Sequence, residues 1–104
     1  MKIWLDDQIT DPESPKRWPP EGFIGVKNLA ELKKLLERNL EEIEVMDFDH
    51  DLGEDEPSGY DIIKWMTEHH LDRWPREVLV HSANPPGAKN IREHDAFVRR
   101  RLLS

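Results

Sequence analysis

Four short apolar runs are spaced along the chain, and each is followed by turn-forming or charged residues. They cover residues 2–5, 23–26, 43–48 and 78–80. Short apolar runs without strict alternation are typical of strands buried in a sheet that is covered on both faces. The hydrophobic pattern therefore predicts four strands.

Helical spacing of apolar residues follows three of these runs. Five leucines recur on one face over 29–40, behind Asn28, a residue type that commonly caps a helix N-terminus. A second helix is predicted to begin at Ser58 and a third at about Ala88. The remaining connection, residues 8–22, contains four prolines and is predicted to be a loop without a helix.

Strands that alternate with helices predict parallel βα units, here in a single α/β domain spanning residues 1–104. In such sheets, ligands bind beyond the carboxyl ends of the strands. Three of the four predicted strands carry polar, chemically capable residues at that end. The functional residues are therefore expected at this edge of the sheet.

Composition and charge narrow the classes of function. The net charge of −7 gives no general footprint for duplex DNA, and no apolar run is long enough to span a membrane. The absence of cysteine excludes disulfides, thiolate nucleophiles and cysteine-ligated zinc. The N-terminus reaches Asp6 and Asp7 too soon for a secretory signal, so a cytoplasmic protein is expected.

An acidic group is expected where the first and third strands end. Asp6, Asp7 and Asp49 converge there if those strands are neighbours, and Asp51 is a fourth candidate metal ligand. Closely packed carboxylates repel one another unless a cation neutralises them or some bind protons. Hard oxygen ligands at a partly open site suit Mg²⁺ or Mn²⁺. The same spacing also fits aspartates that only end strands and form turns, so both interpretations stay open.

A calcium loop of the EF-hand type is an alternative that the sequence argues against. Asp47, Asp49 and Asp51 fit its first three ligand positions. Leu52 then occupies the position of its glycine, and Ser58 that of its bidentate glutamate. Both differences remove geometry or charge that the loop requires, and we therefore exclude it.

Two histidines, His50 and His81, follow the third and fourth strands on the same edge as the acids. A histidine there can exchange protons near neutral pH or bind a metal, although it can also simply bond to loop backbone. Together with Asp49, they are the candidate catalytic residues. The candidate phosphate-binding residues follow the fourth strand and open the last helix: Ser82, Asn84, Lys89 and Asn90. All four are also ordinary turn or surface residue types.

Four motifs, in this order, resemble the receiver superfamily of response regulators, and most closely its cyclic-phosphate-processing receiver domain family. They are Leu5-Asp6-Asp7, Asp49-His50-Asp51-Leu52-Gly53, Gly59-Tyr60-Asp61, and His81-Ser82-Ala83-Asn84-Pro85 with Asn90 beyond. The acid pair alone is a weak signal, whereas the second and fourth motifs are specific. Together the motifs span almost the whole chain.

The resemblance implies a truncated flavodoxin- or receiver-like three-layer fold. It has about four parallel strands in the order 2-1-3-4, helices on both faces and no fifth strand. The resemblance also implies Mg²⁺ binding by Asp6, Asp7 and Asp49. The lysine that receivers carry after a fifth strand has no counterpart in this chain. An arginine expected shortly after the acid pair is here Ile9, and Arg17 is the residue that can reach the site from the loop.

Three functional hypotheses follow. The leading one is a metal-dependent phosphodiesterase, or a binding protein, for a cyclic phosphate on a small nucleotide or an RNA end. The alternative is a degenerate receiver that works as an aspartyl-phosphorylation switch on Asp49 or as a docking module. The third is an interaction protein without chemistry that presents the acidic residues 47–56 to a basic partner.

Overall fold

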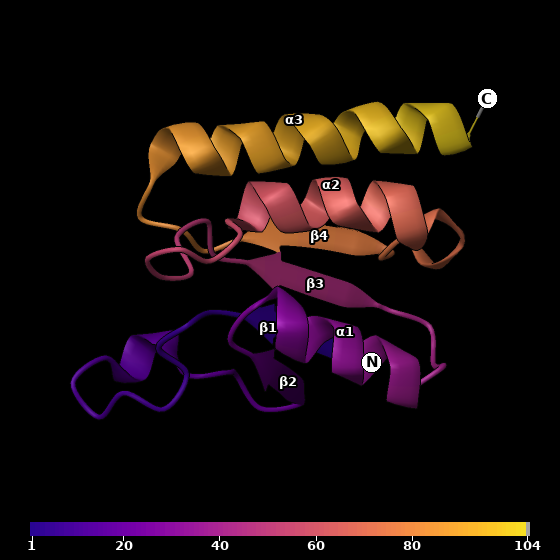
Figure 1. Cartoon of the computed structure of the whole chain (residues 1–104). Helices are drawn as coiled ribbons and strands as arrows, with labels where there is room; N and C mark the ends of the chain where they lie inside the picture. The colour runs from indigo at the N-terminus through magenta and orange to yellow at the C-terminus, as the bar shows by residue number, and fades with distance from the viewer. Residues whose placement is uncertain (104) are drawn as a thin grey trace.

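The computed structural model describes residues 1–103, which form a four-stranded parallel sheet with three α-helices (Figure 1). The strands are β1 (Lys2–Leu5), β2 (Phe23–Val26), β3 (Val45–Phe48) and β4 (Glu77–Val80), in the order β2-β1-β3-β4. This order is the predicted one. Because β1 and β3 are neighbours, with Leu5 opposite Phe48, the residues that follow these two strands meet at one edge of the sheet.

Each α-helix begins after a side chain that caps its first turn. The helices are α1 (Leu29–Arg38) after Asn28, α2 (Gly59–His69) after Ser58, and α3 (Pro85–Leu102) after Asn84. In each case a side-chain oxygen of the capping residue accepts a hydrogen bond from a backbone amide of the first turn, which would otherwise lack a partner. No helix within residues 1–103 combines the length and the hydropathy needed to cross a membrane.

Two helix bounds differ from the predictions. α3 begins at Pro85 rather than near Ala88, because Asn84 supplies the cap and proline is compatible with a first helical turn. α1 ends at Arg38, so Leu40, which was expected on its buried face, lies beyond the helix and is 85% exposed.

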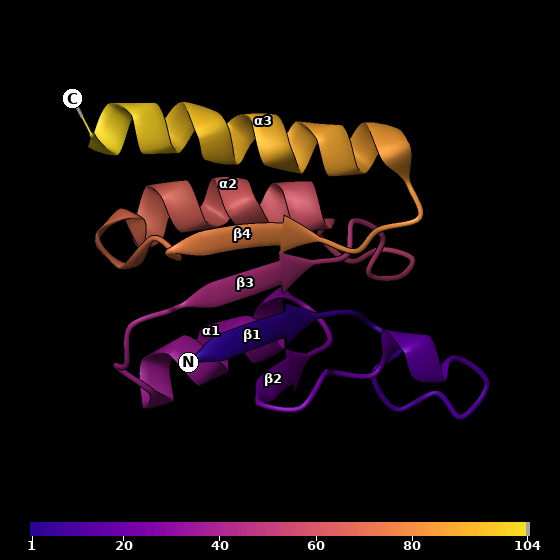
Figure 2. The ribbon, with the colours of Figure 1, turned by 180° about the vertical axis from the view of Figure 1, so that it is seen from behind.

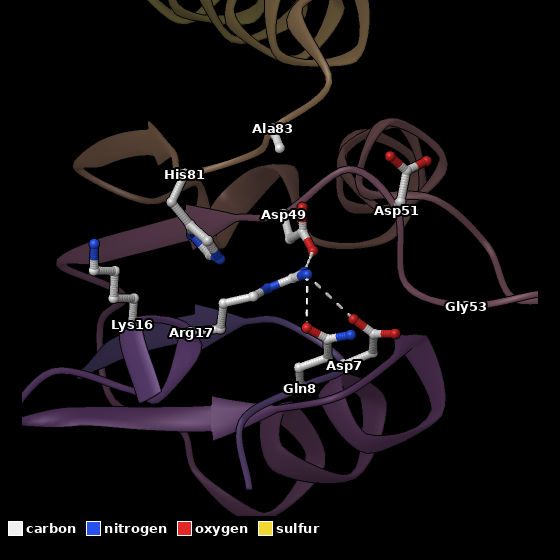
Figure 3. A pocket seen from close by; sticks show the side chains of 9 residues that line it. All are labelled: Asp7, Gln8, Lys16, Arg17, Asp49, Asp51, Gly53, His81 and Ala83. Carbon is white, nitrogen blue, oxygen red and sulfur yellow. Dashed lines mark hydrogen bonds and ion pairs between the residues drawn. The ribbon is translucent and has the colours of Figure 1, made fainter. Parts of the chain in front are cut away.

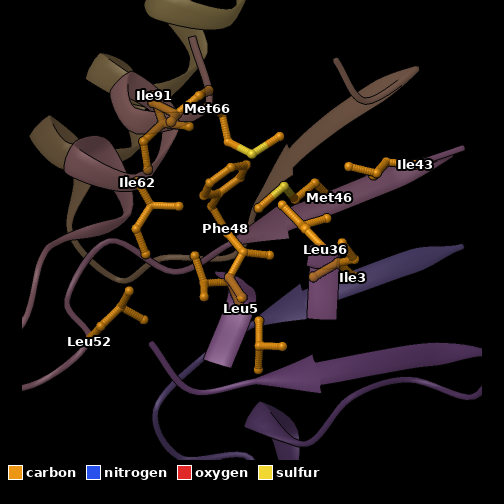
Figure 4. Packing of buried hydrophobic residues seen from close by; sticks show 13 residues of the cluster. Ile3, Leu5, Leu36, Ile43, Met46, Phe48, Leu52, Ile62, Met66 and Ile91 are labelled. Carbon is orange, nitrogen blue, oxygen red and sulfur yellow. The ribbon is translucent and has the colours of Figure 1, made fainter. Parts of the chain in front are cut away.

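The apolar core lies between the sheet and the helices (Figure 4). Successive side chains of a strand point to opposite faces of a sheet. Ile3 and Leu5 of β1 and Met46 and Phe48 of β3 accordingly face the core. The helices contribute Leu32, Leu36, Ile62, Ile63, Met66 and Ile91. The strand residues that alternate with these core residues face the opposite side.

Helices were expected on both faces of the sheet, but the α-helices pack on the core face (Figures 1 and 2). Figures 1 and 2 show α1 and α2 on the same side, and Leu79, on the opposite face of β4, is 41% exposed. Part of this face is covered by the segment 8–22 instead. A Cβ on Gly25 would lie 2.7 Å from the Pro19 side chain and 3.0 Å from that of Ile9, which shows how closely the segment approaches β2.

The segment 8–22 also contains a short 3₁₀ helix, η1 (Pro15–Arg17), where a loop without a helix was predicted; a second 3₁₀ helix, η2 (Leu71–Arg73), precedes β4. The indole Nε1 of Trp4 donates a hydrogen bond of 2.9 Å to the carbonyl oxygen of Arg17. This bond ties η1 to the sheet and holds the backbone of Arg17 next to the edge where the strands end.

Candidate functional site

Three carboxylates meet where β1 and β3 end. One oxygen from each of Asp6, Asp7 and Asp49 lies within 4.8 Å of the others. Asp6 is 0% and Asp49 3% exposed, and Asp7 is half-buried. Backbone amides orient the two buried carboxylates: Gln8 donates to Asp6 Oδ1 at 2.8 Å and His50 to Asp49 Oδ1 at 2.9 Å. The sequence predicted this convergence from neighbouring strand ends.

The donor set fits a small divalent cation. Three carboxylates on a half-open site supply the hard oxygen ligands that Mg²⁺ and Mn²⁺ prefer, and they leave positions for water or a phosphate oxygen.

Asp51, the fourth predicted ligand, lies outside this group of three. Its carboxylate instead contacts Nδ2 of Asn84 at 3.2 Å and Nδ1 of His50 at 3.1 Å. These two hydrogen bonds, the one from Asn84 foremost, lower the pKa of Asp51.

Arg17 reaches the three carboxylates from η1 (Figure 3). Its Nε lies 2.9 Å from Asp6 Oδ2, and its Nη2 contacts Asp49 Oδ2 and, at 3.5 Å, Asp7 Oδ1. Its Nη1 donates to Gln8 Oε1 at 2.9 Å. Burial opposes the charge of Arg17, but the hydrogen bond to Asp6 and the nearby carboxylates outweigh burial and raise its pKa. For Asp49, burial raises the pKa, and Arg17 offsets only part of that rise.

His81 is held between two carboxylates. Its Nε2 lies 2.9 Å from Asp6 Oδ2 and its Nδ1 2.7 Å from Asp47 Oδ1, while the indole of Trp4 stacks on the imidazole with the ring centres 3.7 Å apart. Burial opposes its charge, but the hydrogen bonds to Asp47 and Asp6 outweigh burial and raise its pKa. Both nitrogens donate only when the ring is an imidazolium. The predicted proton exchange with a ligand would therefore require His81 to break one of these bonds.

Asp47 is a site residue that the sequence reasoning missed. It lies within β3, is 8% exposed, and points away from the core face occupied by its neighbours Met46 and Phe48. Its signal in the sequence is an acid inside an apolar strand, since an ionised side chain is rarely buried without a partner. That partner is His81, which directly follows the adjacent strand β4. The hydrophobic pattern alone does not indicate that Asp47 and His81 are paired.

His50 faces the beginning of α3 rather than the carboxylates. Its Nδ1 lies 3.1 Å from Asp51 Oδ1 and 3.3 Å from Asn84 Nδ2. A Cβ on Gly87 would lie only 2.3 Å from the His50 ring, so the ring packs directly on the helix backbone. The two predicted catalytic histidines thus occupy different surroundings, and His81 is the one that contacts the carboxylate group.

The four predicted phosphate-binding residues are not among those that line the open cavity beside the carboxylates. Ser82 Oγ accepts a hydrogen bond from the Asn84 amide, and Asn84 Oδ1 caps α3 through the Gly87 amide. Lys89 lies 3.7 Å from Glu93 on the exposed side of α3, and Asn90 is also exposed. Ser82 and Asn84 thus shape the turn and the helix start, which is an ordinary role of their residue types.

An open cavity of about 510 Å³ adjoins the carboxylates (Figure 3). Its lining residues are Asp7, Gln8, Lys16, Arg17, Asp49, Asp51, Gly53, His81 and Ala83. Figure 3 shows Arg17 extended toward Asp7, Gln8 and Asp49, with the Lys16 amine apart from them. Gln8, Lys16 and Gly53 were not predicted from the sequence, because their place in the cavity depends on how the two loops fold back. A cavity with both acids and cations in its walls suits an anionic ligand that binds together with a metal ion.

Comparison with known proteins places the chain in a family. No curated protein and no solved structure matches the chain significantly. One family model, however, matches residues 1–94. This match is consistent with the observed strand order and with the acid pair and aspartate at the strand ends. It also links the chain to the processing of cyclic phosphates. Residues 1–94 match the family model of the cyclic-phosphate processing receiver domain, and the chain therefore belongs to that family.

Proposed function

We propose that this protein binds a cyclic phosphate ester in the cavity at the strand ends and, with a divalent cation, hydrolyses it. The observation that carries the proposal is the grouping of the carboxylates of Asp6, Asp7 and Asp49 beside an open cavity that also presents Arg17. This grouping occurs in a chain whose family processes cyclic phosphates. Mg²⁺ and Mn²⁺ are the proposed cofactors, and a nucleotide or an RNA end is the proposed source of the phosphate.

The ion pairs around the three carboxylates leave an excess of negative charge. Four carboxylates, the three above and Asp47, face two cationic side chains, Arg17 and His81. With all of them ionised, two negative charges remain uncompensated, and they repel an anionic phosphate. A divalent cation balances them and removes the repulsion.

Each side chain has a separate part in this proposal. The aspartates hold the cation, which when bound would polarise the phosphate and lower the pKa of a water molecule. Arg17 supplies a planar set of donors that suits phosphate oxygens. His81 contacts Asp6 Oδ2 through its Nε2 and orients this carboxylate, and is therefore a positioning residue. His50 packs on α3 and does not line the cavity, so its predicted proton exchange with the ligand would require its ring to turn toward the cavity.

Calorimetric titration with Mg²⁺ or Mn²⁺, with and without 2′,3′-cyclic AMP, tests this proposal. Chromatography of the nucleotide then reports whether its ring is opened. We expect metal binding and metal-dependent ring opening in the wild-type protein, and loss of both in Asp49→Asn. Asp51→Asn is the matched control, because it removes a nearby carboxylate outside the group of three and should keep metal binding.

The possible results separate the competing functions. Ring opening that persists in Asp49→Asn would contradict the proposed centre. Metal binding without ring opening would instead favour the phosphorylation switch, which is tested by transfer of phosphate from acetyl phosphate to Asp49. Absence of metal binding would leave a docking domain as the remaining hypothesis.

A further inference from the structure

Arg17 and a metal ion need the same carboxylate oxygens. The guanidinium of Arg17 contacts Oδ2 of Asp6, Oδ2 of Asp49 and Oδ1 of Asp7. A cation held by all three aspartates has to take one oxygen from each of them. Arg17 therefore occupies the position in which the protein would otherwise hold a metal.

The other oxygens of the two buried aspartates each already accept a backbone hydrogen bond. Asp6 Oδ1 accepts the amide of Gln8, and Asp49 Oδ1 accepts the amide of His50. Both amides belong to the chain immediately after the strands, so these bonds hold the carboxylates in a fixed orientation. A metal that binds Oδ2 of Asp6 and Oδ2 of Asp49 thus competes with Arg17 at both atoms, and at Asp6 also with Nε2 of His81.

We propose that Arg17 is an internal cation that a divalent metal displaces, and that its displaced guanidinium then binds the anionic ligand. The proposal rests on the metal and phosphate site proposed above. It adds the order of events, in which the carboxylates exchange one cation for another and the released arginine turns to the phosphate. Metal binding and anion binding are then coupled through a single side chain.

The surroundings of Arg17 allow this exchange. Its side chain is 35% exposed and lines the open cavity, so the guanidinium can turn toward a ligand without entering the core. Its backbone stays in place, because its carbonyl oxygen accepts the hydrogen bond from Trp4 Nε1. Only the side chain has to change its rotamer. Gln8 Oε1, 2.9 Å from Nη1, gives the guanidinium a partner next to the cavity.

Calorimetric titration of Arg17→Gln with Mg²⁺ and Mn²⁺ tests the competition. We expect metal to bind roughly tenfold more tightly than in the wild type, because a neighbouring cation weakens binding of a second cation to a carboxylate by about that factor or more. Lys34→Gln is the control, since it removes a positive charge from the exposed surface of α1 outside the cavity, and an exposed, screened charge should change the affinity by less than about twofold. In the presence of metal, Arg17→Gln should bind 2′,3′-cyclic AMP more weakly than the wild type.

Opposite changes in metal and nucleotide affinity would support the proposal. Equal metal affinity in the wild type and Arg17→Gln would overturn it while leaving the proposed function intact, whereas no metal binding in either protein would overturn both. The wild type provides a second measurement if Arg17→Gln does not fold. The NMR signal of the Arg17 Nε–H should shift when Mg²⁺ saturates the site, and an unchanged signal at saturation would refute displacement.

Discussion

Gly59 controls the position of Asp49, and replacing it with alanine should disturb both the fold and the site. A Cβ on Gly59 would lie 2.1 Å from the carbonyl oxygen of Asp49 and 3.1 Å from the side chain of Ile91. The closer contact is with backbone that cannot easily move, because Gly59 also donates a hydrogen bond of 2.7 Å to the His50 carbonyl and the Asp49 amide bonds to β1. The end of β3 and the start of α2 therefore have to separate.

The expected cost follows from two opposing effects. Alanine is favoured over glycine in a helix by up to ~1 kcal/mol. Overpacking against a rigid neighbour costs about 1–3 kcal/mol, and a backbone contact of 2.1 Å belongs at the upper end of that range. We expect Gly59→Ala to lower the free energy of unfolding by roughly 2 kcal/mol. Urea unfolding followed by circular dichroism measures this change, and Mg²⁺ affinity should fall as well because Asp49 is displaced.

Gly22→Ala is the matched control for Gly59→Ala. Gly22 has a φ of +87°, but no atom would lie within 4 Å of a Cβ at this position, so its alanine variant suffers only backbone strain of about 1–2 kcal/mol. Metal affinity should not change in this variant, since the residue lies away from the carboxylates. If Gly59→Ala were as stable as the wild type and bound Mg²⁺ equally well, the close approach of α2 to Asp49 would not constrain the site.

Two further predictions concern the histidine and the cap at the strand ends. The pKa of His81 is raised in the folded protein, so its contribution to the free energy of unfolding is complete below the ordinary value of 6.5 and is lost as pH rises through the folded-state pKa. Urea unfolding at several pH values should show a smaller fall in stability with rising pH for His81→Gln than for the wild type. The lowered pKa values of His70 and His94 act in the opposite direction in both proteins, and a parallel pH dependence of the two would contradict this role of His81. Asn84→Ala should cost about 1 kcal/mol by removing the α3 cap. Asn84→Ser keeps a capping acceptor without placing a second carboxylate beside Asp51, and should recover most of this loss in thermal unfolding. An equal loss in both variants would show that the cap is not the cause.

Local signals in the sequence were sufficient to predict most of the fold. Asn28 and Ser58 identified two helix starts to the residue, because a cap depends only on neighbours a few positions away. The strand runs were equally visible. The sequence did not show that one face of the sheet lacks an α-helix. Trp4 continues the apolar run of β1, yet its indole stacks on His81 and bonds to η1 instead of packing against an α-helix.

The site was predictable only where it follows directly from strand order. Asp6, Asp7 and Asp49 meet because neighbouring parallel strands end at the same edge. The pairing of Asp47 with His81 depends on the register of β3 against β4, which no local pattern specifies. The contacts of the loop residues with the site depend on tertiary folding in the same way.

The segment 8–22 contributes to the candidate site but not to the apolar core cluster. Within residues 1–103, the apolar core cluster draws on the strands, the helices and their connections but not on this segment, although the segment supplies the cation that contacts all three carboxylates. An exchange of this segment for one of different length or charge would leave the core cluster in place, and would change only the packing on the opposite face of the sheet, at Trp4 and Gly25. Fifteen consecutive residues that the core cluster does not include therefore decide which cation faces the three carboxylates.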